Sequence, residues 1–397
     1  MKKVLIIGAG FLQSFVIKKA KQLGYFTLAV DANPNAEGFK YCDEYAVINI
    51  VDEKACCEFA QSQNIDGVLT AATDYGVLTA AYIAQKLKLP GLKYETAKVI
   101  KNKYLVRKKL YEMGADDTGK CYEISDIEEL LKIRENINFP VMVKPCDGSG
   151  SRGAAKVNFI EELETACNTA MSNSLTHKAI IEPFIFGKEY GVESFCYNDE
   201  KIVLGVMEKQ MTKPPYYAEL GHCIPSGLPQ EVEEKIKKCV KKALEALDVN
   251  FGSVKMDLLL TEDNNVHIVD IGARMGGNLI GSHIIPYGTG ICYIENMIRA
   301  AVGDCVDFSP VMPKTCVATR LLALTPGKVK ALPDFEKIKE EYGVEIEHHL
   351  KAGDVINEYH TNLDGCGYVV SRKDNRLLAT SDAAEALKKV DNEVILE

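Results

Sequence analysis

The chain has 397 residues, of which 47% are hydrophobic and 26% are charged, and its formal net charge is −9. This length predicts two to three structural units around substantial cores. The acidic balance argues against a nucleic-acid partner, because such proteins usually carry a basic face, and no stretch approaches the roughly 20 apolar residues that a membrane span needs.

The N-terminal part of the sequence alternates between strand-like and helix-like segments. Residues 4–7 form a continuous apolar run, which is typical of a parallel strand buried on both faces. We expect further strands at 27–30, 45–50 and 67–70, and helices at 11–23, 52–61 and 75–87. This alternation predicts a doubly wound α/β domain that ends near residues 90–91.

The remaining sequence reads as a linker followed by two further units. Residues 95–113 predict an amphipathic helical linker, and residues 139–144 predict a strand that runs into a glycine-rich loop. Other predicted elements are strands at 180–182 and 191–197, a helix at 231–247, and an antiparallel hairpin at 253–260 and 266–271. After Gly303 the sequence is strand-rich again, at 317–324 and 367–371, and predicts a smaller C-terminal α+β unit.

A glycine turn follows the first predicted strand. Gly8 and Gly10 resemble the start of a dinucleotide-binding fingerprint, but the position of its third glycine holds Gln13. Asp31, at the end of the second predicted strand, would suit a ribose hydroxyl. Because the fingerprint is incomplete, the pattern favours a tight turn without a cofactor, which could still cradle a small anion at the helix N-terminus.

A stronger signal is a lysine ahead of a loop of small residues. Lys144 ends a predicted strand, and the loop that follows contains Gly148, Ser149, Gly150 and Ser151. Glycines let backbone N–H groups approach phosphate oxygens closely, and the lysine adds a point charge. No Gly-Lys-Ser/Thr sequence ends the loop, so it is not a Walker A loop. It predicts a phosphate site, and a mobile surface loop without a ligand is the alternative.

Two acids flank a short apolar segment further on. Glu182 and Glu189 lie on either side of a segment that contains Phe184. A purine amine needs an acceptor beside an apolar slot, and ribose hydroxyls need a carboxylate, so these acids would suit a nucleoside. Taken alone the signal is weak, because glutamates that flank a strand are usually solvated.

Two aspartates lie in apolar strands of the predicted hairpin. Asp257 and Asp270 would be neighbours across it, and facing carboxylates repel one another unless a cation lies between them. Mg²⁺ prefers carboxylates together with nucleotide phosphates, so the pair predicts a metal site. Solvent-facing acids at the strand ends are the alternative. Arg274 follows between small residues and predicts an anion site for a phosphate or a substrate carboxylate.

The order of these motifs resembles the ATP-grasp superfamily, of the carbamoyl phosphate synthetase and biotin carboxylase type, over nearly the whole chain. The resemblance implies a Rossmann-like pre-ATP-grasp α/β domain at 1–92, a two-lobed ATP-grasp domain at 93–305 with a mobile lid lobe at about 118–186, and a small C-terminal α+β domain at 306–397. It implies that ATP and Mg²⁺, or Mn²⁺ in its place, are bound. The nucleotide residues that it implies are Lys103, Lys144, Gly148, Ser149, Gly150, Ser151, Glu182, Phe184 and Glu189. It assigns the metal to Asp257 and Asp270, and the catalytic stabilisation of the transferred phosphoryl group to Arg274 and Lys144.

Within this superfamily the sequence is most similar to the L-amino acid ligase branch. The run from Ala273 to Gly277 carries the similarity, as does the segment of Glu219 and His222, which the branch places near the acid substrate. The substrate residues implied are therefore Glu219, His222, Arg274 and Gly277. One departure is that many relatives carry Glu-x-Asn at the second metal position, whereas Gly272 has no side chain to ligate.

The resemblance implies an ADP-forming ligase that activates a carboxylate as an acyl phosphate and joins it to an amine. Its partners would be small molecules, and dimers are common in this class. The 13 cysteines contain no Cys-x-x-Cys pair and indicate reduced thiols in a cytoplasmic protein. Three alternatives stay open: an enzyme of carbamoyl-phosphate or purine type that uses bicarbonate or a nucleotide precursor, a non-catalytic ATP-binding regulator, and a nicotinamide oxidoreductase.

Overall fold

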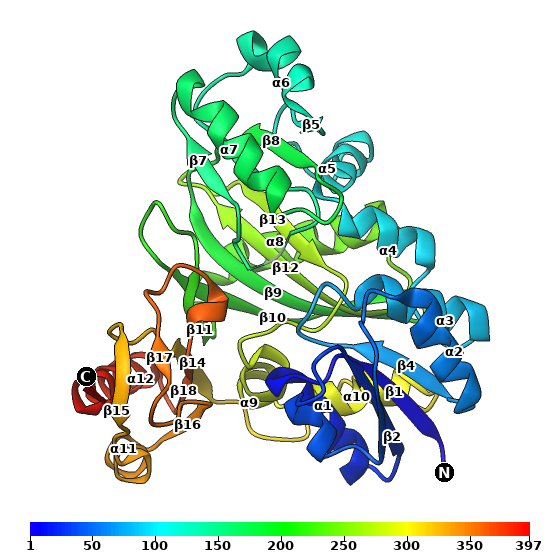
Figure 1. The fold of residues 1–397 in the computed structure, drawn as a ribbon, viewed down its shortest axis with the longest axis vertical. Coiled ribbons are helices and arrows are strands. Elements are labelled where there is room, and N and C mark those ends of the chain that lie inside the picture. The colour runs from blue at the N-terminus through cyan, green and yellow to red at the C-terminus, as the bar shows by residue number, and fades with distance from the viewer. Residues whose placement is uncertain (149) are drawn as a thin grey trace.

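The computed structural model of the chain describes residues 1–148 and 150–397. Figure 1 shows a long central sheet with three units around it: the N-terminal unit at the lower right, a small lobe at the top and the C-terminal unit at the lower left. The mixed α/β and α+β class predicted from the sequence is confirmed. None of the helices in the described ranges combines the length and the apolar character that a bilayer crossing needs.

The N-terminal unit is the predicted doubly wound α/β domain. Its elements are β1 (Lys3–Ile7), α1 (Phe11–Gln22), β2 (Phe26–Asp31), β3 (Glu44–Val47), α2 (Glu53–Ser62), β4 (Gly67–Thr70) and α3 (Val77–Leu87). The strands pair in parallel in the order β3-β2-β1-β4, and the apolar residues of β1 from Val4 to Ile7 are fully buried. Because the strands are parallel, their carboxyl ends share one edge, and the connection after β4 begins at that edge.

The linker at 95–113 is helical as predicted, and it is divided into two helices. They are α4 (Tyr94–Lys101) and α5 (Lys103–Glu112). Asn102 separates them in an extended conformation, and its side chain accepts a hydrogen bond of 3.0 Å from the Leu105 N–H. This N-cap starts a new helix at Lys103, so Lys103 projects from a first helical turn.

The lobe at the top of Figure 1 is a small antiparallel sheet covered by helices. Its elements are β5 (Tyr122–Ile124), α6 (Ile127–Ile133), β6 (Val141–Pro145), β7 (Ala155–Val157), α7 (Ile160–Ser172) and β8 (Ala179–Pro183). The strand order is β5-β8-β6-β7. The glycine-rich loop connects β6 to β7, so it lies at the edge of this sheet. Ser149 belongs to this loop but lies outside the described residues.

The central sheet is antiparallel and carries the predicted hairpin. Its elements, with the helices that follow them, are β9 (Lys188–Tyr197), β10 (Glu200–Met211), β11 (Glu219–Ile224), α8 (Gln230–Ala246), β12 (Gly252–Leu260), β13 (Val266–Gly272), α9 (Ile285–Thr289) and α10 (Tyr293–Ala301). The register pairs Asp257 of β12 with Asp270 of β13, as the hairpin predicted. Strands β10 and β11 were not predicted, because buried charged residues such as Lys209 and Glu219 interrupt their apolar pattern.

The C-terminal unit shares the central sheet. Its elements are β14 (Cys316–Leu321), β15 (Gly327–Ala331), α11 (Phe335–Tyr342), β16 (Val344–His348), β17 (Val355–Ile356), β18 (Gly367–Lys373), α12 (Arg376–Glu393) and β19 (Ile395–Leu396). Strand β14 pairs with β11, which gives the sheet order β13-β12-β9-β10-β11-β14-β18-β16. The boundary expected at residue 305 thus cuts one continuous sheet, and residues of the C-terminal unit reach the cleft described below.

Candidate active site

A cleft of about 880 Å³ lies between the lobe, the central sheet and the N-terminal unit. Most of the residues that the sequence singled out line it, although they come from segments far apart in the chain. The predicted residues that line the cleft are Lys103, Lys144, Gly148, Gly150, Ser151, Glu182, Phe184, Glu189, Glu219, Asp257, Asp270, Arg274 and Gly277. The fold therefore brings the phosphate, metal and anion candidates into one space.

Lys144 belongs to a buried ionic triad at the base of the lobe. Its ammonium lies 2.6 Å from Glu182 Oε1, and Arg107 Nε donates to Glu182 Oε2 at 2.7 Å. Burial alone would raise the pKa of Glu182, but the Arg107 guanidinium and the Lys144 ammonium outweigh it and hold the pKa at about 2. Since both oxygens of Glu182 accept from cations, its carboxylate fixes Lys144 at the floor of the cleft.

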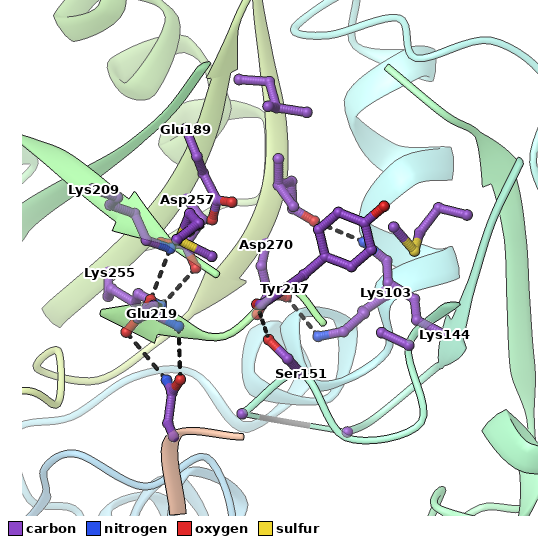
Figure 2. Close-up of a pocket in the computed structure, with 18 of the residues that line it drawn as sticks. Lys103, Lys144, Ser151, Glu189, Lys209, Tyr217, Glu219, Lys255, Asp257 and Asp270 are labelled. Atoms are coloured by element: carbon purple, nitrogen blue, oxygen red, sulfur yellow. Dashed lines mark hydrogen bonds and ion pairs between the residues drawn. The ribbon is translucent and has the colours of Figure 1, made fainter. Parts of the chain in front are cut away.

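Lys103 faces Asp270 across the cleft. The Lys103 ammonium lies 2.6 Å from Asp270 Oδ1, as Figure 2 shows. The backbone N–H of Lys103 donates to the Cys146 carbonyl at 2.8 Å, which ties the start of α5 to the end of β6. Burial would raise the pKa of Asp270, but Lys103, Lys144 and Lys255 hold it well below its usual value. Asp270 is therefore an anion beside two cationic side chains.

Aromatic rings form an apolar wall on the lobe side. Phe184 and Phe186 pack edge to face with their centroids 5.0 Å apart, and Tyr217 lies 6.2 Å from Phe184. The Lys156 ammonium lies 4.5 Å from the centroid of the Phe184 ring. This wall lies beside Phe184, where the sequence predicted an apolar slot for a purine, and that assignment stays a prediction.

A second ionic cluster lies on the opposite side of the cleft (Figure 2). Lys209 is its centre: the ammonium lies 2.5 Å from Glu189, 2.7 Å from Glu219 and 2.9 Å from Asp257. Lys255 lies 2.5 Å from Asp257 Oδ2. Burial lowers the pKa of Lys209, but the three carboxylates outweigh it and raise the pKa well above its usual value. The Lys209 ammonium is therefore a stable positive charge at the centre of the cluster.

Asp257 and Asp270 offer the carboxylate oxygens that Mg²⁺ prefers, but the two side chains differ in how many of their oxygens already contact lysines. Both oxygens of Asp257 already contact lysines, whereas Lys103 contacts Oδ1 of Asp270. The described ranges contain no cluster of three or more His, Cys, Asp or Glu side chains arranged for a metal. A nucleotide-bound Mg²⁺ needs only one or two carboxylates, because phosphates supply the other oxygens. The donor set therefore fits such an ion, and Asp270 is the more available ligand.

Arg274 is held by an acid from the N-terminal unit. Its Nε and Nη2 donate to Asp74 Oδ1 and Oδ2 at 3.0 and 2.8 Å, and Nη1 donates to the Met275 carbonyl at 3.2 Å. A Cβ on Gly272 would lie 2.8 Å from Asp74 Oδ1, so this glycine leaves room for the aspartate. The bidentate site of Arg274 is thus occupied by a side chain, and a ligand anion would have to share or replace Asp74.

Glu193 anchors the turn that follows Arg274. The carboxylate accepts from the Gly276 N–H at 3.2 Å and from the Tyr293 hydroxyl. Burial raises the pKa of Glu193 to about 7, although Tyr293, Gly276 and Arg274 oppose the shift. Glu193 therefore fixes the backbone two residues after Arg274.

Glu219 is covered by the C-terminal unit. Asn278 Nδ2 donates to Glu219 Oε2, Asn362 Nδ2 donates to the same oxygen at 3.2 Å, and the Tyr359 hydroxyl donates to the Glu219 carbonyl. Gly277, which precedes Asn278 in the chain, also lines the cleft. His222 differs from the expectation for a substrate residue: its side chain is fully buried, and neither ring nitrogen has a hydrogen-bond partner among the described residues. His222 does not line the cleft, although β11 pairs it in register with Lys209 of β10, which does.

The glycine turn after β1 is closed by its own side chains. Asp31 Oδ2 accepts from the Ala9 N–H at 2.9 Å, and Gln13 Nε2 donates to the Ala71 carbonyl at 2.6 Å. Asp31 therefore stabilises the turn itself, and Gln13 fills the space beside it. This geometry favours the tight turn without a cofactor that the incomplete fingerprint suggested.

Several charged residues of the cleft were not predicted from the sequence, and four of them matter for its electrostatics. They are Asp74, Arg107, Lys209 and Lys255. Two had a usable signal: Asp74 follows the carboxyl end of a parallel strand, where ligand sites gather, and Lys255 is two residues before Asp257, hence on the same face of β12. Arg107 and Lys209 had none, because only the tertiary fold shows that their cationic groups are buried.

Comparisons with known proteins identify two domains in the chain. Residues 137–282 match the model of the ATP-grasp domain, and residues 320–394 match the L-amino acid ligase C-terminal domain 2. An L-amino acid ligase structure from Bacillus licheniformis covers 100% of this chain and 99% of its own with a TM-score of 0.85 at 21% identity, which shows a shared fold.

Two further similarities span most of the chain. A phosphoribosylglycinamide synthetase structure from Anaerococcus prevotii is 25% identical, has a TM-score of 0.76 and covers 100% of both chains. The uncharacterized protein y4rH from Sinorhizobium fredii is 24% identical over 83% of this chain and 69% of its own length. The two domain models and the shared fold confirm the resemblance that the sequence motifs predicted.

Proposed function

Since the chain is an ATP-grasp protein with an L-amino acid ligase C-terminal domain, we propose that it is an ATP- and Mg²⁺-dependent, ADP-forming ligase that joins a carboxylate to an amine, with amino acids as substrates. The observation that carries the proposal is that one cleft has two walls of different chemistry facing each other. One wall presents Lys103, Lys144 and an aromatic slot, and the other presents Arg274 and Glu219. The first wall suits a nucleotide, and the second suits a zwitterion.

The nucleotide is proposed to lie along the lobe. The aromatic wall at Phe184 takes the adenine ring, Glu189 is the candidate acid for the ribose, and Lys103 and Lys144 hold the phosphates. The backbone of Gly148, Gly150 and Ser151 covers the phosphates, and Ser149 is assigned to the same loop from the sequence alone. Asp270 and Asp257 would hold Mg²⁺, whose positive charge would stabilise the negative charge that develops on the transferred phosphoryl group.

The proposed chemistry has two balanced steps. In the first, a substrate carboxylate oxygen attacks the γ-phosphorus, the bond to the β-phosphate oxygen breaks, and ADP leaves with an acyl phosphate formed. In the second, the lone pair of a neutral amine attacks the acyl carbon, the carbon–oxygen bond to phosphate breaks, and the amine proton passes to the departing phosphate or to solvent. Lys144 and Arg274 stabilise the charge on the transferred group, so catalysis rests mainly on positioning and electrostatics.

The substrate side suits an amino acid because it offers both signs of charge. Glu219 is the proposed partner of an ammonium group, and Arg274 is the proposed partner of a carboxylate or of the transferred phosphoryl group. Asn278 and Asn362 orient the Glu219 carboxylate. Glu219 stays ionised, because Lys209 and Lys255 outweigh burial and hold its pKa well below the usual value.

The experiment is ADP release from Mg²⁺-ATP with pooled L-amino acids, with and without bicarbonate. Release that needs two amino acids is the expected result, and the Asp270→Ala variant serves as the blank. Release with bicarbonate alone would instead show an enzyme of the carboxyphosphate type. Binding of ATP without release under any of these conditions would favour a regulator.

A further inference from the structure

Tyr75 joins the glycine-rich loop to the N-terminal unit. It lies in the connection between β4 and α3, lines the cleft, and accepts a hydrogen bond of 2.6 Å from Arg152 Nη2. Arg152 belongs to the loop between β6 and β7, on the other side of the cleft mouth. This contact therefore bridges the cleft between two units that the chain connects only through α3, α4 and α5.

The Tyr75 ring lies close to a second cation, the ammonium of Lys101. The Lys101 ammonium is 4.7 Å from the ring centroid, and the Arg152 guanidinium carbon is 6.0 Å from it. Among the described residues Lys101 Nζ is buried without a hydrogen-bond partner, and the ring face is a favourable contact for its charge. Lys101 ends α4 and holds the ring in place from the N-terminal side of the cleft.

The loop has a second anchor in the connection between β10 and β11. Ser151 Oγ donates to the Tyr217 carbonyl at 2.6 Å, as Figure 2 shows. Gly150 and Ser151 both have positive φ, of 68° and 61°. A serine with positive φ is uncommon and persists only when its surroundings hold it. The contacts of Ser151 and Arg152 supply that restraint, one on each side of the cleft.

We propose that Tyr75 is a positioning residue that latches the glycine-rich loop over the cleft and so keeps water away from the acyl phosphate. The latching of the loop does not depend on the proposed function, whereas the exclusion of water from the acyl phosphate rests on it. An acyl phosphate that meets water before the amine gives the free acid and phosphate, so each such event releases ADP without an amide. The effect of the latch is therefore measured as the number of ADP molecules released for each amide formed.

The first test measures loop closure without any amino acid. Trypsin cleaves after arginine, so its rate of cleavage between Arg152 and Gly153 in the full-length protein with Mg²⁺-ADP reports how often the loop opens. Tyr75→Phe keeps the ring and removes the hydroxyl, and we expect cleavage to be roughly tenfold faster, the effect of losing one hydrogen bond to a charged group. Tyr82→Phe, in a residue that packs on Tyr94 and Lys86 instead, is the matched control and should cleave as the wild type does.

The second test measures coupling with the amino acids that support ADP release. The wild type should release about one ADP per amide formed, and Tyr75→Phe and Arg152→Met should each release more. The double variant should release no more ADP per amide than Arg152→Met alone, because Arg152→Met already removes the contact that Tyr75→Phe removes. Lys101→Met should act in the same direction if the ring needs its support.

The outcomes separate the two proposals. A wild type that shows no amino-acid-dependent ADP release defeats the proposed function, while the trypsin comparison still decides the latch. Equal cleavage rates in wild type and Tyr75→Phe overturn the latch whatever the enzyme does. Faster cleavage with unchanged coupling overturns the role in excluding water.

Discussion

Asp74 and Arg274 lie 200 positions apart and form a bidentate ion pair at the meeting point of the N-terminal unit and the central sheet. Burial would raise the pKa of Asp74, but Arg274 outweighs it and lowers the pKa. The pair is therefore ionised at neutral pH, and it makes the geometry of the proposed anion site depend on both units.

The Asp74→Asn variant should weaken this arrangement without changing its shape. An amide accepts with only one oxygen and carries no charge, so Arg274 loses its bidentate partner. We expect roughly a hundredfold lower kcat for amino-acid-dependent ADP release, which is the scale of a misplaced catalytic group, with little change in ATP affinity. Asp199→Asn, in an exposed turn where asparagine is well tolerated, is the control. Equal activity of the two variants would contradict a role for the pair.

A substitution at Gly272 tests the same Asp74–Arg274 contact without changing either partner. An added Cβ would lie 2.8 Å from Asp74 Oδ1, so Gly272→Ala should push the aspartate away from Arg274 and reproduce the loss seen with Asp74→Asn. Gly365→Ala is the control, because its Cβ would meet no described atom closer than 3.5 Å. Steady-state kinetics of both variants decide the point, and a fully active Gly272→Ala enzyme would show that Asp74 can move without consequence.

Glu193 predicts a pH dependence of stability. Burial raises its pKa from 4.5 to about 7, so between these values the folded protein holds a proton that the unfolded chain has lost. The free energy of unfolding should therefore fall as the pH rises through this window, by about 3 kcal/mol for this group. Glu193→Gln should remove that slope in urea denaturation at pH 5 and pH 7.5, whereas exposed Glu164→Gln should keep it. An unchanged slope in Glu193→Gln would refute the assignment.

Glu182 predicts a large effect of the opposite sign. Its pKa of about 2 lies below its usual 4.5, so its contribution to stability is present above pH 4.5 and is lost as the pH falls towards 2. Glu182→Gln leaves Arg107 and Lys144 buried with one neutral partner, and we expect a loss of about 3–5 kcal/mol at pH 7. Chemical denaturation measures it, and a loss no larger than that of Glu164→Gln would contradict the ionic triad.

The parts of the site that the sequence predicted are those whose pattern is local. The hairpin register of Asp257 and Asp270 follows from two apolar strands and a short turn, and Lys144 follows from a strand that ends in a glycine-rich loop. The departures have physical reasons. Lys209 is invisible as a site residue because a lysine inside a strand normally indicates an exposed edge, and only the fold places three carboxylates around it.

The contribution of the N-terminal unit to the cleft could not be predicted from the sequence either. The end of β4 predicted a loop at the sheet edge, but no local pattern indicates that this loop meets β13 at Asp74. His222 is a second example: it lies in the predicted substrate segment and is fully buried outside the cleft lining, whereas Glu219 three residues earlier lines the cleft.

The central claim is that a substrate carboxylate is activated by phosphoryl transfer, and the most direct measurement follows the carboxylate oxygen. The wild-type enzyme would be given Mg²⁺-ATP, an amine and an amino acid whose carboxylate is labelled with oxygen-18, and the released phosphate would be analysed by mass spectrometry. The account predicts one labelled oxygen in each phosphate released with an amide, and no release by Asp270→Ala. Amide formation with unlabelled phosphate would show that the carboxylate never attacks the γ-phosphorus and would contradict the account.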